Sequence, residues 1–102
     1  MSDNANAQVK LSERLKWNAY GGDDEKLHGQ TKVGRVQVHI YLTPGPVAPS
    51  VEWEVHVFVP SGPAWRHDGL PNTRLRNARR NAIRAAERLL GMLHPDLLKE
   101  RD

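Results

Sequence analysis

The sequence predicts an α+β fold: a small antiparallel sheet of three to four strands, with one C-terminal amphipathic helix packed on one face. Apolar and polar residues alternate over Val33–Thr43 and again over Val51–Val59, which is typical of strands with one buried face. From Leu75 onward, the apolar residues instead recur every three or four positions, as on one side of a helix. This is the only long amphipathic helix, so we expect its apolar side to cover the apolar face of the sheet.

The two clear strands should form a hairpin across the proline-rich loop at residues 43–50. In an antiparallel pair, the numbers of two opposite residues always add up to the same value. This value must be odd if the apolar residues of both strands face one side, because they are even-numbered in the first strand and odd-numbered in the second. A sum of 93 places His39 opposite Glu54, whereas a sum of 95 places His39 opposite His56 and Tyr41 opposite Glu54. Either register predicts a His/Glu/Tyr patch on the polar face, where ordinary cross-strand pairing is its simplest role.

The N-terminal third leaves two alternatives open for residues 8–32, a hairpin or a helix. Residues 1–7 are polar, and we expect a disordered tail there. The alternation over Gln8–Tyr20 favours a strand, but Ser12–Leu15 is also compatible with the start of a helix. Gly21–Asp24 is a strong turn signal, so two extended flanks would make a hairpin.

The C-terminal third is expected to hold the helix. Asn72 or Thr73 is a suitable N-cap, and the helix should end at Gly91 or at the latest before Pro95. We therefore expect one domain over residues 8–94 and a polar tail over 95–102. Before the helix, Trp65–His67 is a candidate edge strand.

Arginines occupy the polar side of this helix. Its apolar side is predicted to comprise Leu75, Ala78, Ala82, Ala86, Leu89 and Leu93, with Ile83 and Leu90 beside it. The opposite side carries an arginine at every fourth position, and we call these residues the arginine ridge: Arg76, Arg80, Arg84 and Arg88. Arg79 instead falls within the apolar side, where it either extends past the helix edge or pairs with a carboxylate such as Glu52 or Glu54.

The distribution of charge suggests an anionic partner. Residues 72–90 contain six arginines and one acid, Glu87, for a formal charge of +5, whereas the whole chain carries +3. Guanidinium groups suit phosphate and carboxylate because they present a planar fork of donors that stays charged. We expect nucleic-acid binding of low sequence specificity, with Tyr41 or Trp65 stacking on unpaired bases. The predicted contacts are Arg74, Arg76, Arg79, Arg80, Arg84, Arg88, Trp65 and Tyr41.

Part of the sequence resembles the double-stranded RNA-binding domain. The family has three antiparallel strands followed by a helix that opens with a basic cluster around an alanine. The matching residues within 36–93 are Gly45-Pro46, the alternating run Val51–Val57, the cluster Arg76–Arg80, Ala82 and Ala86. The resemblance implies that Arg76, Arg79 and Arg80 contact phosphates across the major groove of duplex RNA. The family begins with a helix that contacts the minor groove, whereas residues 8–20 here favour a strand.

Other functions remain open at this stage. The arginine ridge also suits a small inhibitor or accessory subunit that docks on an acidic partner protein, or a merely solvated helix face. His39 and His56 would serve acid–base chemistry in a small nuclease or hold a metal, whereas His28 and His94 have no evident companions. We expect no enzyme activity, metal or cofactor, because the sequence carries no catalytic or metal-binding motif.

Cysteine and hydropathy set further expectations. The chain has no cysteine, which excludes a disulfide, a thiolate zinc site and a cysteine nucleophile and fits a cytoplasmic location. No apolar run approaches the roughly 20 residues of a membrane-spanning helix. An exposed sheet edge would allow a homodimer by strand pairing.

Overall fold

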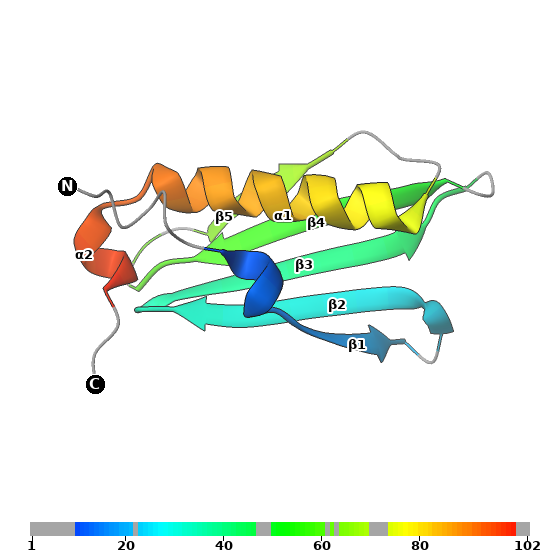
Figure 1. Cartoon of the computed structure of the whole chain (residues 1–102), viewed down its shortest axis with the longest axis horizontal. Coiled ribbons are helices and arrows are strands. Elements are labelled where there is room, and N and C mark those ends of the chain that lie inside the picture. Colours follow the sequence, from blue (N-terminus) through cyan, green and yellow to red (C-terminus); the bar gives the residue numbers. More distant parts are fainter. Residues whose placement is uncertain are drawn as a thin grey trace.

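The computed structural model has five antiparallel strands in one sheet, ordered β1-β2-β3-β4-β5, with a helix lying along one face (Figure 1). It describes residues 10–21, 23–46, 50–60, 62, 64–69 and 74–99. The elements are the 3₁₀ helix η2 (Leu11–Glu13), β1 (Lys16–Tyr20), β2 (Asp23–Val33), β3 (Val36–Pro44), β4 (Val51–Phe58), β5 (Ala64–Asp68), α1 (Leu75–Gly91) and α2 (Pro95–Leu98). The expected α+β class is confirmed, with five strands rather than three to four. The expected tail at residues 1–7 lies outside the described residues.

The additional strands come from the N-terminal hairpin and from the C-terminal edge. β1 and β2 pair antiparallel around Gly21, whose positive φ of 69° suits a tight turn. The hairpin alternative is therefore confirmed from Lys16 onward, and among the preceding residues that the structure describes, Leu11–Glu13 form the short η2. The strand expected to begin at Val33 is divided, because Gly34 and Arg35 turn the chain between β2 and β3. β5 pairs with β4 as the expected edge strand.

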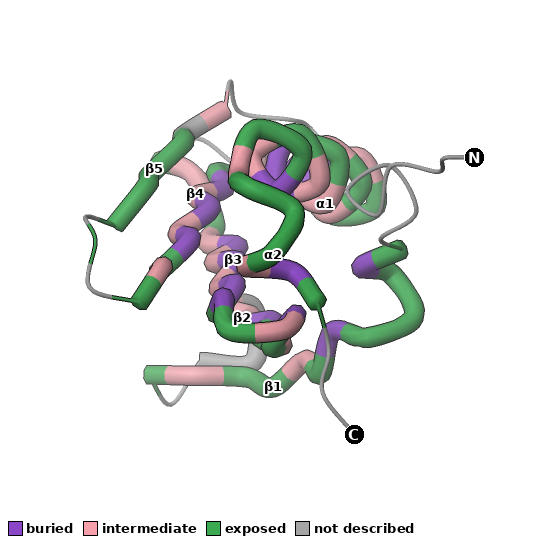
Figure 2. Tube along the Cα trace, turned by 90° about the vertical axis from the view of Figure 1, so that its left-hand side faces the viewer, coloured by how far each residue is buried: buried purple, intermediate pink, exposed green. Residues whose placement is uncertain are grey.

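The register of β3 and β4 follows the sum of 95. His39 pairs with His56 and Tyr41 with Glu54, while the apolar residues of both strands share the face beneath α1. Buried residues alternate with more exposed ones along β3 and β4 (Figure 2). The alternation in the sequence thus predicted which side of each strand is buried.

The core lies between α1 and the sheet, mainly over β3 and β4. Its fully buried side chains include Val38, Ile40 and Val55 from the sheet and Leu90 from α1. The buried residues of α1 are Ala78, Ala82, Ala85, Ala86 and Leu90, so small side chains line most of its contact with the sheet. The buried side is turned slightly from the predicted one, because Ala85 and Leu90 are central and Leu75 is 40% exposed.

The two ends of α1 agree with the sequence prediction to different degrees. The helix ends at Gly91, as expected, but begins at Leu75 with Arg74 in the N-cap position. Arg74 has extended φ and ψ, and its side chain makes no capping hydrogen bond. The predicted caps Asn72 and Thr73 lie outside the described residues, and the helix starts later than that prediction required.

The packed domain continues beyond the expected boundary at residue 94. Pro95–Leu98 forms the single helical turn of α2, in which Leu98 is only 5% exposed. The backbone N–H of Arg35 donates to the carbonyl of Leu97 at 2.9 Å. The turn between β2 and β3 and the C-terminal turn therefore hold each other in place.

We predict that Gly34→Ala destabilises the protein more than Gly21→Ala. Both glycines have positive φ, which costs an alanine about 1 kcal/mol. A Cβ at Gly34 would also lie 2.5 Å from the carbonyl oxygen of Leu97, whereas at Gly21 its nearest neighbour is a Lys26 side-chain carbon at 3.7 Å. This crowding should add about 1–3 kcal/mol.

Urea unfolding of both variants measures the difference. Equal losses of unfolding free energy would show that α2 does not constrain the turn at Gly34.

Candidate nucleic-acid interface

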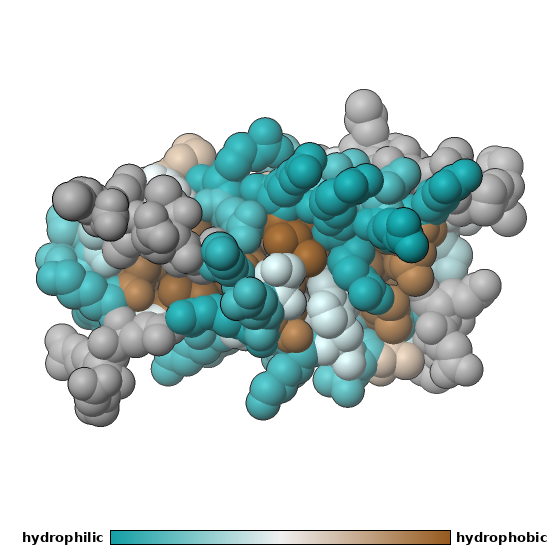
Figure 3. All heavy atoms as spheres, in the orientation of Figure 1, coloured by the Kyte–Doolittle hydropathy of each residue, from teal (hydrophilic) through white to brown (hydrophobic). Residues whose placement is uncertain are grey.

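The arginine ridge lies on the exposed side of α1. All four of its arginines are exposed, and hydrophilic side chains gather over the helix in the space-filling view (Figure 3). Arg80 donates from Nη2 to Asn77 Oδ1 at 2.8 Å. Within the described ranges, no carboxylate forms an ion pair with a ridge arginine. The ridge is therefore a row of guanidinium groups open to an external anion.

A shallow cleft of about 350 Å³ adjoins the ridge, and we call it the arginine cleft. Its lining residues are Ser12, Arg76, Arg79, Arg80, Ile83, Arg84 and Glu87. Glu87 Oε2 accepts a hydrogen bond from the backbone N–H of Leu11 at 3.1 Å, so this carboxylate anchors η2 to α1. The single acid of the arginine-rich segment thus has a structural contact.

Arg79 does not pair with Glu52 or Glu54, as the second alternative for this residue required. Its guanidinium carbon lies 4.8 Å from the centre of the Trp17 ring, in the geometry of a cation–π contact. Glu54 pairs instead with Arg66 on the opposite face of the sheet. Arg79 therefore extends past the edge of α1 towards β1, as the first alternative required, and is half-buried.

The other predicted contacts lie in different places. Arg74 is exposed but occupies the extended N-cap position ahead of the ridge. Trp65 pairs with Val57 and is therefore on the α1 side of the sheet, where it is 41% exposed. Tyr41 points to the other face, since its partner is Glu54. The structure thus brings the helical arginines together but separates them from Tyr41 by the thickness of the sheet.

The face without α1 carries the predicted His/Glu/Tyr patch, which additional side chains extend into a cluster of rings. The members of this ring cluster are Tyr20, His28, His39, Tyr41, His56 and Phe58. His28 enters it because β2 pairs with β3 so that His28 is opposite Tyr41. The sequence could have indicated this only through the position of the turn. With the turn at Gly34, His28 lies opposite Tyr41 and Gln30 lies opposite His39.

His28 and His39 form a flat pair of imidazoles. Nε2 of His28 lies 2.9 Å from Nδ1 of His39, the ring centres are 5.1 Å apart, and the planes differ by 9°. Such a short N···N distance with parallel planes means that the rings lie edge to edge in one plane. Tyr41 stacks on His28 at 4.6 Å with an interplanar angle of 5°.

One arrangement of protons satisfies the contacts of the pair with Gln37 oriented as it is in the structure. His39 Nε2 lies 3.4 Å from Gln37 Oε1, which accepts only if that nitrogen carries a hydrogen. In the neutral ring, Nδ1 of His39 is then bare and accepts from Nε2–H of His28. Protonation of both rings would set two N–H groups against each other and break the pair.

Burial lowers the pKa of both histidines, and neighbouring positive charge lowers the pKa of His39 further. Burial lowers the pKa of His28 below its ordinary value of 6.5. The pKa of His39 is lowered first by burial and then by the positive charges that His28 and His56 acquire on protonation. Both rings are therefore held neutral at neutral pH.

Among the described residues, no group of three His, Cys, Asp or Glu side chains is arranged to hold a metal ion. The described helices include none that is long and apolar enough to cross a membrane. Comparison with protein-family models, with curated proteins and with solved structures found no match.

We predict that stability falls as pH is lowered from 7.5 to 5.5, and that His28→Gln/His39→Gln reduces this fall. A histidine with a lowered pKa in the folded state binds protons less readily than in the unfolded chain. Stability is thus fully present above about 6.5, the unfolded pKa, and is lost as pH falls towards the folded pKa.

The urea midpoints of wild type and double variant at both pH values test this. The variant controls for all other titrating groups, because it shares them. An equal fall in both proteins would contradict the prediction.

Proposed function

We propose that the protein binds nucleic acid through the arginine ridge and the arginine cleft, with low sequence specificity. The observation that carries the proposal is the row of exposed guanidinium groups without ion-pair partners in the described chain. Like charges four residues apart repel each other by a few tenths of a kcal/mol. A polyanion would relieve this repulsion and would release its own counterions on binding.

The length of the ridge suits a phosphate backbone. Residues 76 and 88 are twelve positions apart, which corresponds to about 18 Å along a helix axis. A nucleic-acid duplex carries roughly ten phosphate charges over that distance. Four guanidinium forks can therefore each contact a phosphate without a defined register, which favours binding over sequence discrimination.

The resemblance to the double-stranded RNA-binding domain supports duplex RNA as the preferred polymer. It assigns the phosphate contacts to Arg76, Arg79 and Arg80. Arg79 packs on Trp17, so Arg76 and Arg80 are the freer of the three to reach a backbone. Trp65 lies on the same side of the sheet as α1 and would approach the same ligand from β5.

We predict that Arg80→Gln/Arg84→Gln weakens binding to duplex RNA, duplex DNA and single strands alike. Loss of two phosphate contacts should make the slope of log K against log salt shallower by about 2 for a duplex. Fluorescence anisotropy at several salt concentrations measures both quantities. The unfolding free energy should not decrease, because the variant removes a repulsive pair from α1.

The matched control is Arg35→Gln/Lys99→Gln, which removes the same charge. Arg35 lies in the turn between β2 and β3 and Lys99 follows α2, both at the end of the sheet away from Arg80 and Arg84. Unchanged affinity in the ridge variant, or an equal loss in the control, would reject the ridge as the site. Absence of all nucleic-acid binding at low salt would instead favour an acidic protein partner.

A further inference from the structure

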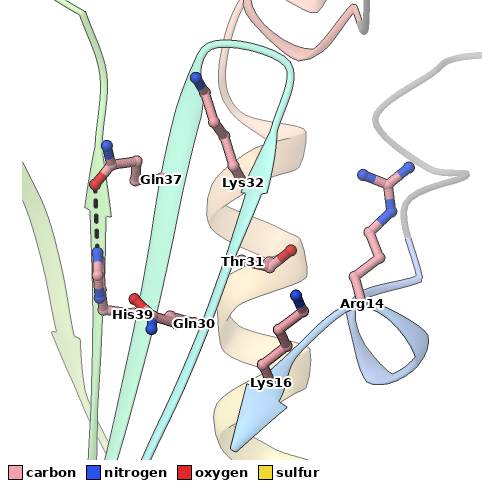
Figure 4. A pocket seen from close by; sticks show the side chains of 7 residues that line it. All are labelled: Arg14, Lys16, Gln30, Thr31, Lys32, Gln37 and His39. Carbon is pink, nitrogen blue, oxygen red and sulfur yellow. Dashed lines mark hydrogen bonds between the residues drawn. The ribbon is translucent and has the colours of Figure 1, made fainter.

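The edge of β2 carries a second cationic cleft, on a different part of the molecule from the ridge. β1 begins at Lys16, opposite Gln30, so Thr31 and the rest of β2 have no partner strand on that side among the described residues. The cleft there measures about 440 Å³, and we call it the β2-edge cleft (Figure 4). Its lining residues are Arg14, Lys16, Gln30, Thr31, Lys32, Gln37 and His39, and none of them is acidic.

The ring cluster adjoins this cleft through one of its members, His39. His39 lines the cleft directly, and its coplanar partner His28 extends the flat surface towards β2. Tyr41 follows His39 by two residues on β3 and stacks on His28, whereas Gln37 precedes His39 on the cleft side. Tyr41 thus supports His28, and Phe58 meets His39 edge-on at 5.5 Å between ring centres, so neighbouring rings hold the imidazole pair beside the cleft.

Two amide side chains flank the exposed part of His39. Gln30 is its cross-strand partner, and Gln37 accepts from its Nε2 through Oε1. This contact leaves the amide nitrogen of Gln37 as a donor, while Gln30 offers both a donor and an acceptor. Lysines lie at the ends of the same surface, Lys16 on β1 and Lys32 on β2 (Figure 4).

We propose that the β2-edge cleft binds one unpaired nucleotide of a single-stranded nucleic acid. Lys16 and Lys32 each contact one of the two phosphates that flank the nucleotide, the base stacks against the ring of His39, and the amides of Gln30 and Gln37 contact the base edge. The cleft volume lies within the range of about 300–1,000 Å³ that is usual for small-ligand sites. Aromatic surfaces beside cationic grooves are how proteins hold single strands without strong sequence preference.

The combination of groups favours a nucleotide over other anions. An acidic peptide would use the lysines but would leave the ring surface and the two amides without a role. A duplex keeps its base faces stacked inside the helix and cannot present one to His39. The site is separate from the arginine ridge, so the two proposals can fail independently.

The test compares a labelled ten-nucleotide single-stranded RNA with an abasic strand of the same length by fluorescence anisotropy. Both probes are titrated with the Arg80→Gln/Arg84→Gln variant, because this variant makes fewer phosphate contacts through the ridge. The strand with bases should bind at least about fivefold more tightly, the lower limit for stacking one base on an aromatic ring. Equal affinities would overturn the proposal.

Variants of the cleft separate its two parts. His39→Ala should reduce the advantage of the strand with bases to less than about twofold and leave abasic binding unchanged. Lys16→Gln/Lys32→Gln should weaken both probes and make the salt slope shallower by about 1.4, the value for two phosphate contacts to a single strand. A base-dependent advantage that survives His39→Ala would place the base elsewhere.

A measurement on the unaltered protein covers the case in which His39→Ala fails to fold. Titration of wild type with the same RNA should shift the imidazole NMR signals of His28 and His39, while the exposed His94 at the start of α2 serves as the control. Shifts confined to His94, or absent from all three histidines at saturation, would overturn the proposal. Binding that involves only the ridge would give that negative result, so the two sites remain distinguishable.

Discussion

A single helix is narrower than the sheet that it must cover, and this mismatch governs the rest of the structure. Five strands at about 4.8 Å spacing span roughly 19 Å between the outer strands, whereas a helix with its side chains is about 10 Å across. α1 therefore covers β3 and β4, and the flanks of the same face need other cover. At the β1 flank, Trp17 lies over Gly29, where a Cβ would come within 2.8 Å of the ring.

The cover on the flanks also positions the basic side chains. Arg79 reaches past the edge of α1 to lie on Trp17, and Glu87 holds the backbone of Leu11, so η2 is fixed beside the helix. These two contacts position Arg79 and Glu87, which both line the arginine cleft. At the other flank, Trp53 fills the space that the missing side chain of Gly69 leaves. Interactions that complete the core thus also shape the charged surface.

The sequence predicted the parts of the fold that depend on simple periodicity. The alternation of β3 and β4 and the spacing of the alanines in α1 reflect one-sided burial, which any sheet covered by a helix requires. The register of 95 was one of two allowed values, because alternation fixes phase but not offset. The break at Gly34 was missed since both flanks alternate, and only its positive φ and its contact with Leu97 reveal the turn.

The candidate sites could likewise be predicted only where they depend on spacing within one element. The arginine ridge was visible because its members follow one helix, so that sequence spacing alone determines their common side. The ring cluster combines residues of β1, β2, β3 and β4, and its geometry depends on every register between them. His28 has no companion until β2 is aligned, after which it meets Tyr41 and His39.

The two proposed surfaces would differ in the physical property of a nucleic acid to which each responds. Exposed guanidinium groups respond to charge density, which single strands and duplexes of any sequence share. A flat imidazole pair beside amides and lysines responds to an accessible base face, which only an unpaired nucleotide presents. Since the sheet separates the ridge from Tyr41 and the histidine pair, one short rigid segment cannot occupy both surfaces. A polymer that contacts both must therefore pass around a sheet edge, and the unpaired edge of β2, where the cationic cleft lies, offers the most direct route.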